Sequence, residues 1–269
     1  TAIACGGAGA IFWMWMSAFF GMATIYAEAL MAQKHKTTKD GEVTGGPVYY
    51  IRAAFQGTFG KVLATIFSVL IILALGFMGN AVQANSISDA FATAFGVNPM
   101  VVGVIVALLA FSIFAGGIKR IAEVTEKFVP FMAAFYLIGG MVVILCNLGE
   151  IPRVFHDIFV GAFAPDAVAG GVIGVTVQQS IRYGVARGLF SNEAGMGSTP
   201  HAHAIAKVDH PGEQGCVAIV SVFIDTFCVL TMTTMVIMTS GVLRPDGSLS
   251  GTALTQAAFC TVFGSFGNI

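Results

Sequence analysis

Long apolar runs are the feature that most constrains how this chain can fold. The hydrocarbon core of a bilayer is crossed by about 20 predominantly apolar residues in a helix. Six stretches of roughly that length occur: Ile11–Ala32, Val62–Ser86, Met100–Gly117, Phe128–Leu145, Val168–Val185 and Cys216–Gly241. We therefore predict six membrane-spanning helices, of which the fifth is the weakest because glycines and glutamines interrupt it.

The composition agrees with a membrane protein and excludes several other classes. Of the 269 residues, 56% are hydrophobic and 10% are charged, whereas a soluble domain carries about 25% charged residues. The net charge of −1 offers no basic excess for nucleic acid. The five cysteines form no CxxC pair and are interpreted as small packing residues. The predicted fold class is an all-α integral membrane bundle.

The distribution of Lys and Arg predicts the orientation. Eleven of the 13 basic residues lie in the connections after the first, third and fifth spans, and only Arg153 and Arg244 lie in the others. Because basic connections stay in the cytoplasm, both ends of the chain are predicted to face outward. The chain starts at Thr1 without a signal peptide and stops at Ile269 in an apolar stretch, so we expect an internal segment of a longer protein.

Ionisable residues inside apolar spans are costly and point to function. Asp225 lies near the middle of the sixth span, where a cation site or gate and a structural hydrogen bond are equally plausible interpretations. Glu28 and Arg182 lie near the cytoplasmic ends of the first and fifth spans. For these two residues a structural or gating role is favoured, since both side chains can reach the interface.

A polar face marks the end of the second span. Asn80, Gln83 and Ser86 are spaced three apart and therefore share one face of a helix. A stripe of this kind is costly against lipid, so it should face protein or water. A solute pathway is favoured over plain interhelical hydrogen bonding, which remains the alternative.

The fifth span has the sequence of a discontinuous helix. Gly170, Gly171 and Gly174 weaken it by about 1 kcal/mol each relative to alanine, and Thr176 follows. Unwound backbone at membrane depth occurs only where it lines a cavity, and its free N–H groups suit a carboxylate. The alternative is a close helix contact through the Gly170 and Gly174 pair.

The segment from Gly188 to His203 is the most polar part of the chain and is predicted to form a structured gate or hinge loop. It lacks the Gly-Lys-Ser/Thr of a phosphate loop. Glu193, His201 and His203 form a weak candidate set of metal ligands, and they are also the basis for the remote alternative of a membrane-embedded enzyme.

Several motifs resemble, in order, those of the alanine or glycine:cation symporter family. They cover most of the chain and are Gly6–Gly21, Tyr26–Glu28, Gly45–Ile51, Gln83–Ile87, Arg187–Gly195, Pro200–Ala204 and Asp225–Thr226. The resemblance implies a leucine-transporter-like fold with two inverted five-helix repeats. Residues 1–269 would then be part of a single transporter domain, resembling family helices two to seven and part of the following outer loop. The fifth span falls on family helix six, which is discontinuous in that fold.

The resemblance also implies a function. Family members couple uptake of alanine, glycine or similar amino acids to sodium, occasionally to protons, across the bacterial or archaeal inner membrane, without a cofactor. The main sodium ligands would lie in helices one and eight, outside this chain, so its metal ligands stay unassigned. A proton-coupled or uncoupled carrier is the alternative. Preferred substrate, stoichiometry and oligomeric state remain open.

Site residues follow from these arguments. We expect Gln83 and Asn80 to contact the substrate from the second span, and Gly170, Gly171, Gly174 and Thr176 from the fifth. The inner gate is expected in Ser191–Ser198. Candidate gating or supporting residues are Glu28, Arg182, Ser191, Asn192, Glu193 and Asp225.

Overall fold

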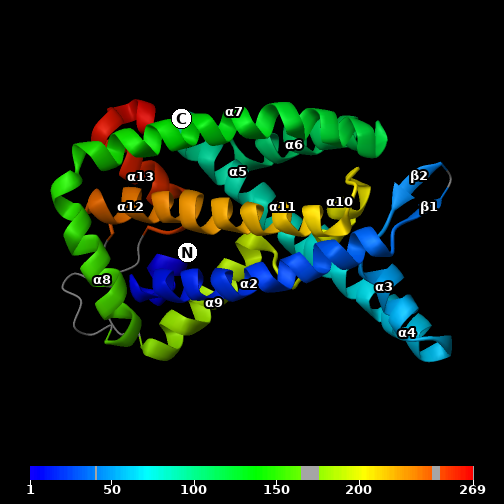
Figure 1. The fold of residues 1–269 in the computed structure, drawn as a ribbon. Coiled ribbons are helices and arrows are strands. Elements are labelled where there is room, and N and C mark those ends of the chain that lie inside the picture. The colour runs from blue at the N-terminus through cyan, green and yellow to red at the C-terminus, as the bar shows by residue number, and fades with distance from the viewer. Residues whose placement is uncertain (40, 165–175, 244–248, 269) are drawn as a thin grey trace.

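The structure is a computed structural model that describes residues 1–39, 41–164, 176–243 and 249–268. Nearly all of these residues lie in helices, and several long helices run side by side (Figure 1). Both chain ends lie toward the left of that view, while the only described strands lie at its right-hand end.

Four helices are long and apolar enough to cross a membrane. They are Gly9–Lys34, Gly57–Phe95, Arg120–Cys146 and Pro211–Thr239. They contain the first, second and fourth predicted spans and most of the sixth, which was predicted to end two residues later, at Gly241. The third span corresponds to α6 (Pro99–Phe114), a shorter apolar helix. Pro99 stands at its first position, and the Asn98 side chain caps it by accepting a hydrogen bond from Met100 N at 2.9 Å.

Two of the long helices are interrupted by π-helical turns, which the sequence analysis did not predict. The first comprises α4 (Gly57–Ile71), the π-helix η1 (Ile72–Gly79) and α5 (Asn80–Phe95). The last comprises α11 (Pro211–Phe223), the π-helix η4 (Ile224–Leu230) and α12 (Thr231–Thr239). Such turns are rare and occur frequently at functional sites.

The fifth predicted span needs a correction at its end. Its described part is α9 (Val177–Asn192), which continues past the predicted end at Val185. Arg182 and Arg187 therefore both lie within this helix. Removing them from the cytoplasmic side still leaves nine basic residues against two, so the predicted orientation is unchanged.

The prediction of a purely α-helical chain was also incomplete. β1 (Thr37–Lys39) and β2 (Glu42–Thr44) form an antiparallel hairpin in which Thr38 pairs with Val43. β-Branched residues favour this extended backbone. After the hairpin, Gly46 adopts a φ of 123°. Pro47 then begins α3 (Pro47–Ala54), a position at which proline is favoured because its missing N–H is not needed there.

Short helices complete the described chain. They are α1 (Ala2–Gly6), η2 (Leu148–Glu150), α8 (Ile151–Phe163), α10 (Pro200–Ile205), α13 (Gly251–Phe263) and η5 (Gly264–Asn268). The fourth predicted span lies in the long helix α7 (Gly117–Cys146). Helix α8 buries Val154 and Ile158, which are spaced four apart and therefore lie on one face of it.

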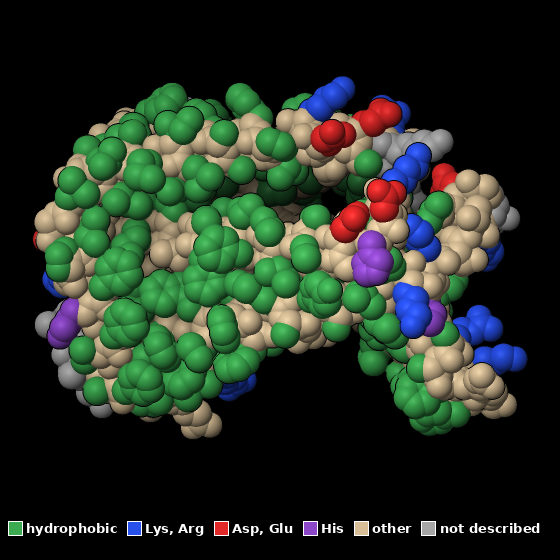
Figure 2. All heavy atoms as spheres, in the orientation of Figure 1, with side chains coloured by type: hydrophobic (Ala, Val, Ile, Leu, Met, Phe, Trp, Pro, Cys, Tyr) green, Lys and Arg blue, Asp and Glu red, His purple; other side chains and the backbone are tan. Residues whose placement is uncertain are grey.

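The surface is largely apolar. Phenylalanine, leucine, valine and isoleucine side chains cover the long helices, and on the face shown most charged side chains gather at the right-hand end (Figure 2). Apolar flanks with charge at the end suit a bundle whose sides face lipid. Cys146, Cys216 and Cys228 lie on this surface, so the interpretation of the cysteines as tightly packed residues was wrong for these three.

Helix α2 (Gly9–Lys34) lies at the centre of the packing and contacts α8, α9, α10 and α11. Its contact with α9 is very close because Gly184 and Gly188 face it. A Cβ atom at Gly184 would overlap the carbonyl oxygen of Ala10, and one at Gly188 would lie 2.6 Å from Ser17 Oγ. Small residues spaced four apart allow this approach in membranes.

We predict that Gly184→Ala destabilises the protein by about 1–3 kcal/mol, because the new methyl group must push α9 away from α2. Unfolding by a denaturing detergent measures the change. The matched control is Gly103→Ala on α6, where a Cβ atom would meet nothing within 4 Å. This control should be neutral or slightly stabilising, since alanine favours a helix. Equal stability of the two variants would contradict the close contact.

Candidate functional site

The end of α9 is shaped by an unusual backbone conformation at Glu193. Its φ of 54° is the only positive value among the described residues that are not glycine. This left-handed residue ends the helix, and its N–H donates to the carbonyl of Leu189. The Ser198 hydroxyl donates to the Glu193 carboxylate, which folds the loop 191–198 back on itself.

The last turn of α9 is joined to the π-helix η4 by two side-chain hydrogen bonds. Ser191 Oγ donates to Asp225 Oδ1 at 3.0 Å, and Asn192 Nδ2 donates to Thr226 Oγ1 at 3.3 Å. Asn192 and Thr226 are both buried. The polar groups are therefore satisfied by one another, as buried groups must be.

Helix α2 holds the same junction from the other side. Glu28 Oε2 accepts a hydrogen bond from the backbone N–H of Gly195 at 3.1 Å. Tyr50 on α3 lies near this carboxylate: burial raises the pKa of the Tyr50 hydroxyl to about 12, and the negative charge of Glu28 adds to the rise. Tyr50 thus stays neutral beside Glu28.

A third connection runs from α2 into η4. Trp15 Nε1 donates to Thr231 Oγ1 at 2.9 Å, and Thr231 Oγ1 donates to the carbonyl of Thr226 at 3.1 Å. The Thr231 hydroxyl thereby satisfies a backbone carbonyl within the π-helical segment. We define the gate junction as Glu28, Ser191, Asn192, Glu193, Asp225 and Thr226 with the loop to Ser198.

The structure thus brings together five of the six residues expected to gate or support the site. The exception is Arg182, which is exposed on the first half of α9, ten residues before Asn192. Sequence reasoning missed Thr226 and Thr231 because a threonine in an apolar helix often bonds only its own backbone.

The residues expected to contact substrate are not gathered in the described part of the chain. Asn80 and Gln83 are exposed on α5, which packs on α6 and α13, whereas Thr176 precedes α9, which packs on α2. Thr176 caps α9: its hydroxyl accepts from Gln179 N at 3.2 Å, and Gln179 Oε1 accepts from Thr176 N at 3.0 Å. The other candidates, Gly170, Gly171 and Gly174, lie outside the described residues.

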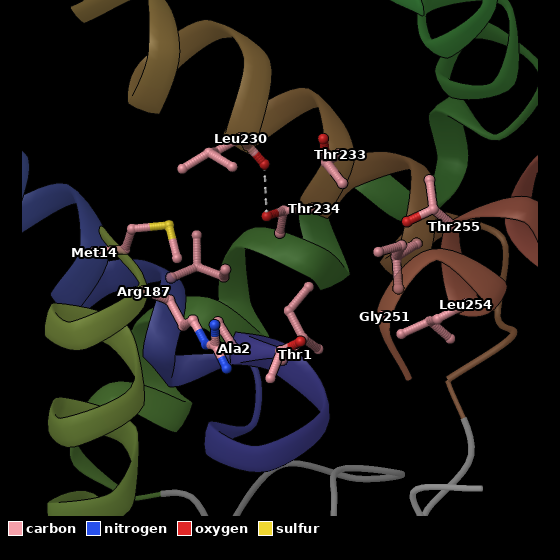
Figure 3. A pocket seen from close by; sticks show the side chains of 13 residues that line it. Thr1, Ala2, Met14, Arg187, Leu230, Thr233, Thr234, Gly251, Leu254 and Thr255 are labelled. Carbon is pink, nitrogen blue, oxygen red and sulfur yellow. Dashed lines mark hydrogen bonds between the residues drawn. The ribbon is translucent and has the colours of Figure 1, made fainter. Parts of the chain in front are cut away.

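A cavity of about 210 Å³ opens between α1, α2, α9, α12 and α13 (Figure 3). The cation in its lining is Arg187 of α9, a half-buried side chain that lies beside Ala2. Four threonine side chains also bring hydroxyl groups to the lining: Thr1, Thr233, Thr234 and Thr255. The sequence analysis counted Arg187 among the loop cations and therefore overlooked it. A guanidinium beside hydroxyl groups suits a carboxylate.

The two histidines considered as metal ligands have separate partners. His203 Nδ1 is 2.7 Å from Gln214 Nε2, and the His203 carbonyl accepts from Gln33 Nε2. His201 Nδ1 is 3.0 Å from the carbonyl of Ser198. These contacts tie α10 to α2 and α11, so the histidines support the gate loop and do not converge with Glu193.

Comparison with known proteins relates the chain to a family of transporters. A family model described as the sodium:alanine symporter family matches residues 1–269. The chain is 45% identical over 263 residues to the sodium/alanine symporter AgcS of Methanococcus maripaludis, covering 96% of this chain and 57% of that protein. It is 42% identical over 280 residues to the putative sodium/proton-dependent alanine carrier protein YrbD of Bacillus subtilis (99% and 56%). It is 40% identical over 265 residues to the probable sodium/glutamine symporter GlnT of the same organism (98% and 54%).

We predict that Ser191→Ala lowers the free energy of unfolding by about 1.5–3 kcal/mol, because it removes the hydrogen-bond donor to the Asp225 carboxylate. Thermal unfolding in detergent measures the change. Ser240→Ala is the control, since among the described residues the Ser240 hydroxyl donates only to the carbonyl of Ile237, three residues earlier. A loss no larger than in this control would argue against the gate junction.

We predict that stability falls as the pH drops below about 6.5 and that His203 causes part of this fall. Burial lowers the pKa of His203 from its ordinary value of 6.5. The unfolded chain then binds the proton more readily, so the contribution is complete above pH 6.5 and lost as the pH falls. His203→Gln should make the midpoint of thermal unfolding depend less on pH between pH 7 and 5.5. A thermal midpoint that depends on pH as strongly in His203→Gln as in the parent protein would contradict this role of His203.

Proposed function

Because the chain belongs to the sodium:alanine symporter family, we propose that its protein is a secondary transporter that couples sodium entry to uptake of alanine, glycine or a similar small neutral amino acid. The chain spans a little over half the length of the curated relatives it matches. The activity proposed is therefore that of the whole protein, in which this chain contributes about half of the structure.

The observation that carries the proposal is the gate junction. A carrier needs an element with two arrangements that its ligands can bias. The junction joins three separate segments, α2, the loop after α9 and the π-helix η4, mostly through single hydrogen bonds. Each such bond contributes only about 0.5–3 kcal/mol. Contacts of this size hold one arrangement and can be exchanged during a transport cycle.

We propose that the fold is leucine-transporter-like, with six spans that correspond to family helices two to seven in one transporter domain. In this scheme α9 is the second half of a discontinuous helix. Its support is the capping box at Thr176 and Gln179, which satisfies N–H groups at a helix start within the predicted fifth span. In this proposal the discontinuity would precede Thr176, at Gly170, Gly171 and Gly174, which lie outside the described residues.

The proposed substrate is a small amino acid with a free carboxylate and a small side chain. Unwound backbone at Gly170, Gly171 and Gly174 would bind the carboxylate, and Gln83 with Asn80 would add hydrogen bonds from α5. The amides of Asn80 and Gln83 are exposed on a membrane-length helix, which is costly against lipid and favours contact with solute or other protein. Arg187 in the cavity beside α9 favours an anionic group on the route.

Sodium is the proposed coupling ion, in a multi-pass protein of the cytoplasmic membrane whose chain ends here face outward. The names of relatives include sodium/alanine, sodium/proton-dependent and sodium/glutamine carriers. A proton-coupled carrier is the second candidate. Asp225 and Glu28 would act by holding the gate junction, while the main ion ligands would come from segments beyond this chain.

The direct test is uptake of labelled alanine by the full-length transporter in proteoliposomes, with and without an inward sodium gradient. We expect accumulation only with the sodium gradient. Accumulation driven by a proton gradient alone would replace sodium with the second candidate. Downhill flux that ignores both gradients would contradict coupled transport.

We further predict that Gln83→Ala raises the KM for alanine about tenfold, because a hydrogen bond to a charged substrate is worth at least 1.5 kcal/mol. The matched control is Gln56→Ala, an exposed amide before α4 that makes no capping hydrogen bond. Its KM should equal that of the parent protein. An unchanged KM in Gln83→Ala would remove α5 from the substrate site.

A further inference from the structure

A second cavity forms a groove between α3 and α4. It has a volume of about 280 Å³ and is lined by Arg52 and Lys61 together with Val48, Ala64, Thr65 and Ser68. Val48 and Arg52 lie on one face of α3, and the other four lie along one face of α4, where Ala64 is buried.

Positive charge in this groove has no protein counterpart in the described part of the chain. The ion pairs among the described residues involve Arg153 or His156, and neither Arg52 nor Lys61 takes part in one. The hydroxyl groups in the groove are already engaged. Thr65 Oγ1 donates to the carbonyl of Lys61, and Ser68 Oγ donates to the carbonyl of Ala64, both at 2.9 Å. Donors for an acceptor in this groove therefore come from Arg52 and Lys61.

Apolar side chains adjoin the basic groove on the outside of α4. Phe55, Phe59, Val62 and Ile66 are each about half exposed or more, and the rings of Phe55 and Phe59 meet edge to face with centroids 5.6 Å apart. Figure 2 shows basic side chains beside an apolar patch at the lower right, where α3 and α4 project in Figure 1. The groove thus lies where a membrane-length helix begins.

We propose that this groove binds the phosphate headgroup of an anionic phospholipid in the cytoplasmic leaflet. The two cations would hold the phosphate, and the apolar side chains of α4 would lie along the acyl chains. Basic pockets beside helices on the cytoplasmic side are suited to such headgroups. Because Arg52 and Lys61 lie in the connection that the Lys and Arg distribution places inside, the negative charge of that leaflet favours occupancy.

The consequence is that lipid binding would fix the position of α3 relative to α4. Helix α3 also packs on α2 and carries Tyr50, which lies near Glu28 of the gate junction. An occupied groove would therefore stabilise the side of the gate junction that α3 supports. The proposal concerns binding alone and does not depend on which solute is transported.

Native mass spectrometry of the delipidated full-length protein tests the proposal with phosphatidylglycerol and phosphatidylcholine as probes. We expect the parent protein to prefer phosphatidylglycerol. Arg52→Gln with Lys61→Gln should lower its affinity roughly 25-fold, since each basic residue near the surface contributes roughly fivefold. The control pair Lys39→Gln with Lys127→Gln removes the same charge from exposed positions outside the groove and should retain the preference.

A charge-preserving pair, Arg52→Lys with Lys61→Arg, controls for loss of binding through misfolding and should keep most of the preference for phosphatidylglycerol. Equal binding of the two lipids by the parent protein would overturn the proposal. So would unchanged phosphatidylglycerol binding after the glutamine substitutions. Competition by inorganic phosphate as effective as that by phosphatidylglycerol would also overturn it, because the groove would then be a free-anion site.

Discussion

The close approach of α2 and α9 is the constraint on which the rest of the described structure depends. Gly184 and Gly188 leave no side chain between the two helices, so the backbone of α9 lies against Ala10, Met14 and Ser17. The hydrophobic effect contributes little to helix association in lipid. Close contact therefore stabilises the bundle through dispersion energy and fixes the positions of the helices. Gly9 extends the same contact toward α8, because a Cβ atom there would overlap the backbone of Gly161.

That contact determines where α9 ends, and the end of α9 is where the polar groups meet. Ser191 and Asn192 reach η4, and the left-handed turn at Glu193 brings the following loop back to Glu28 on α2. The π-helical turn matters here because it changes which residues of the last long helix face α9. The Thr231 hydroxyl then donates to the carbonyl of Thr226 in that turn and itself accepts a hydrogen bond from the Trp15 indole.

Much of this organisation could be predicted from sequence, because the free-energy cost of placing a residue in lipid depends mainly on that residue's own side chain. Apolar runs of membrane length fixed four of the predicted spans, and the polar residues Glu28, Ser191, Asn192, Glu193 and Asp225 stood out against apolar surroundings. The π-helices could not be predicted, since their hydrogen bonds depend on packing between helices. Arg187 and Gly188 were overlooked because the predicted fifth span ended at Val185. Gly184 lies within that span, but its spacing of four from Gly188 was not used. The hairpin was missed because the elements were predicted from the lengths of apolar runs, and the β-branched residues at 37–44 were not considered.

The central claim is that the gate junction has two arrangements and that solute and ion select between them. Hydrogen–deuterium exchange of the full-length protein in nanodiscs tests it most directly, with sodium alone, alanine alone and both together. The account predicts that amide exchange in residues 191–198 changes when sodium and alanine are both present, while the α2 segment packed against Gly184 stays protected. Identical exchange of residues 191–198 in every condition would contradict it.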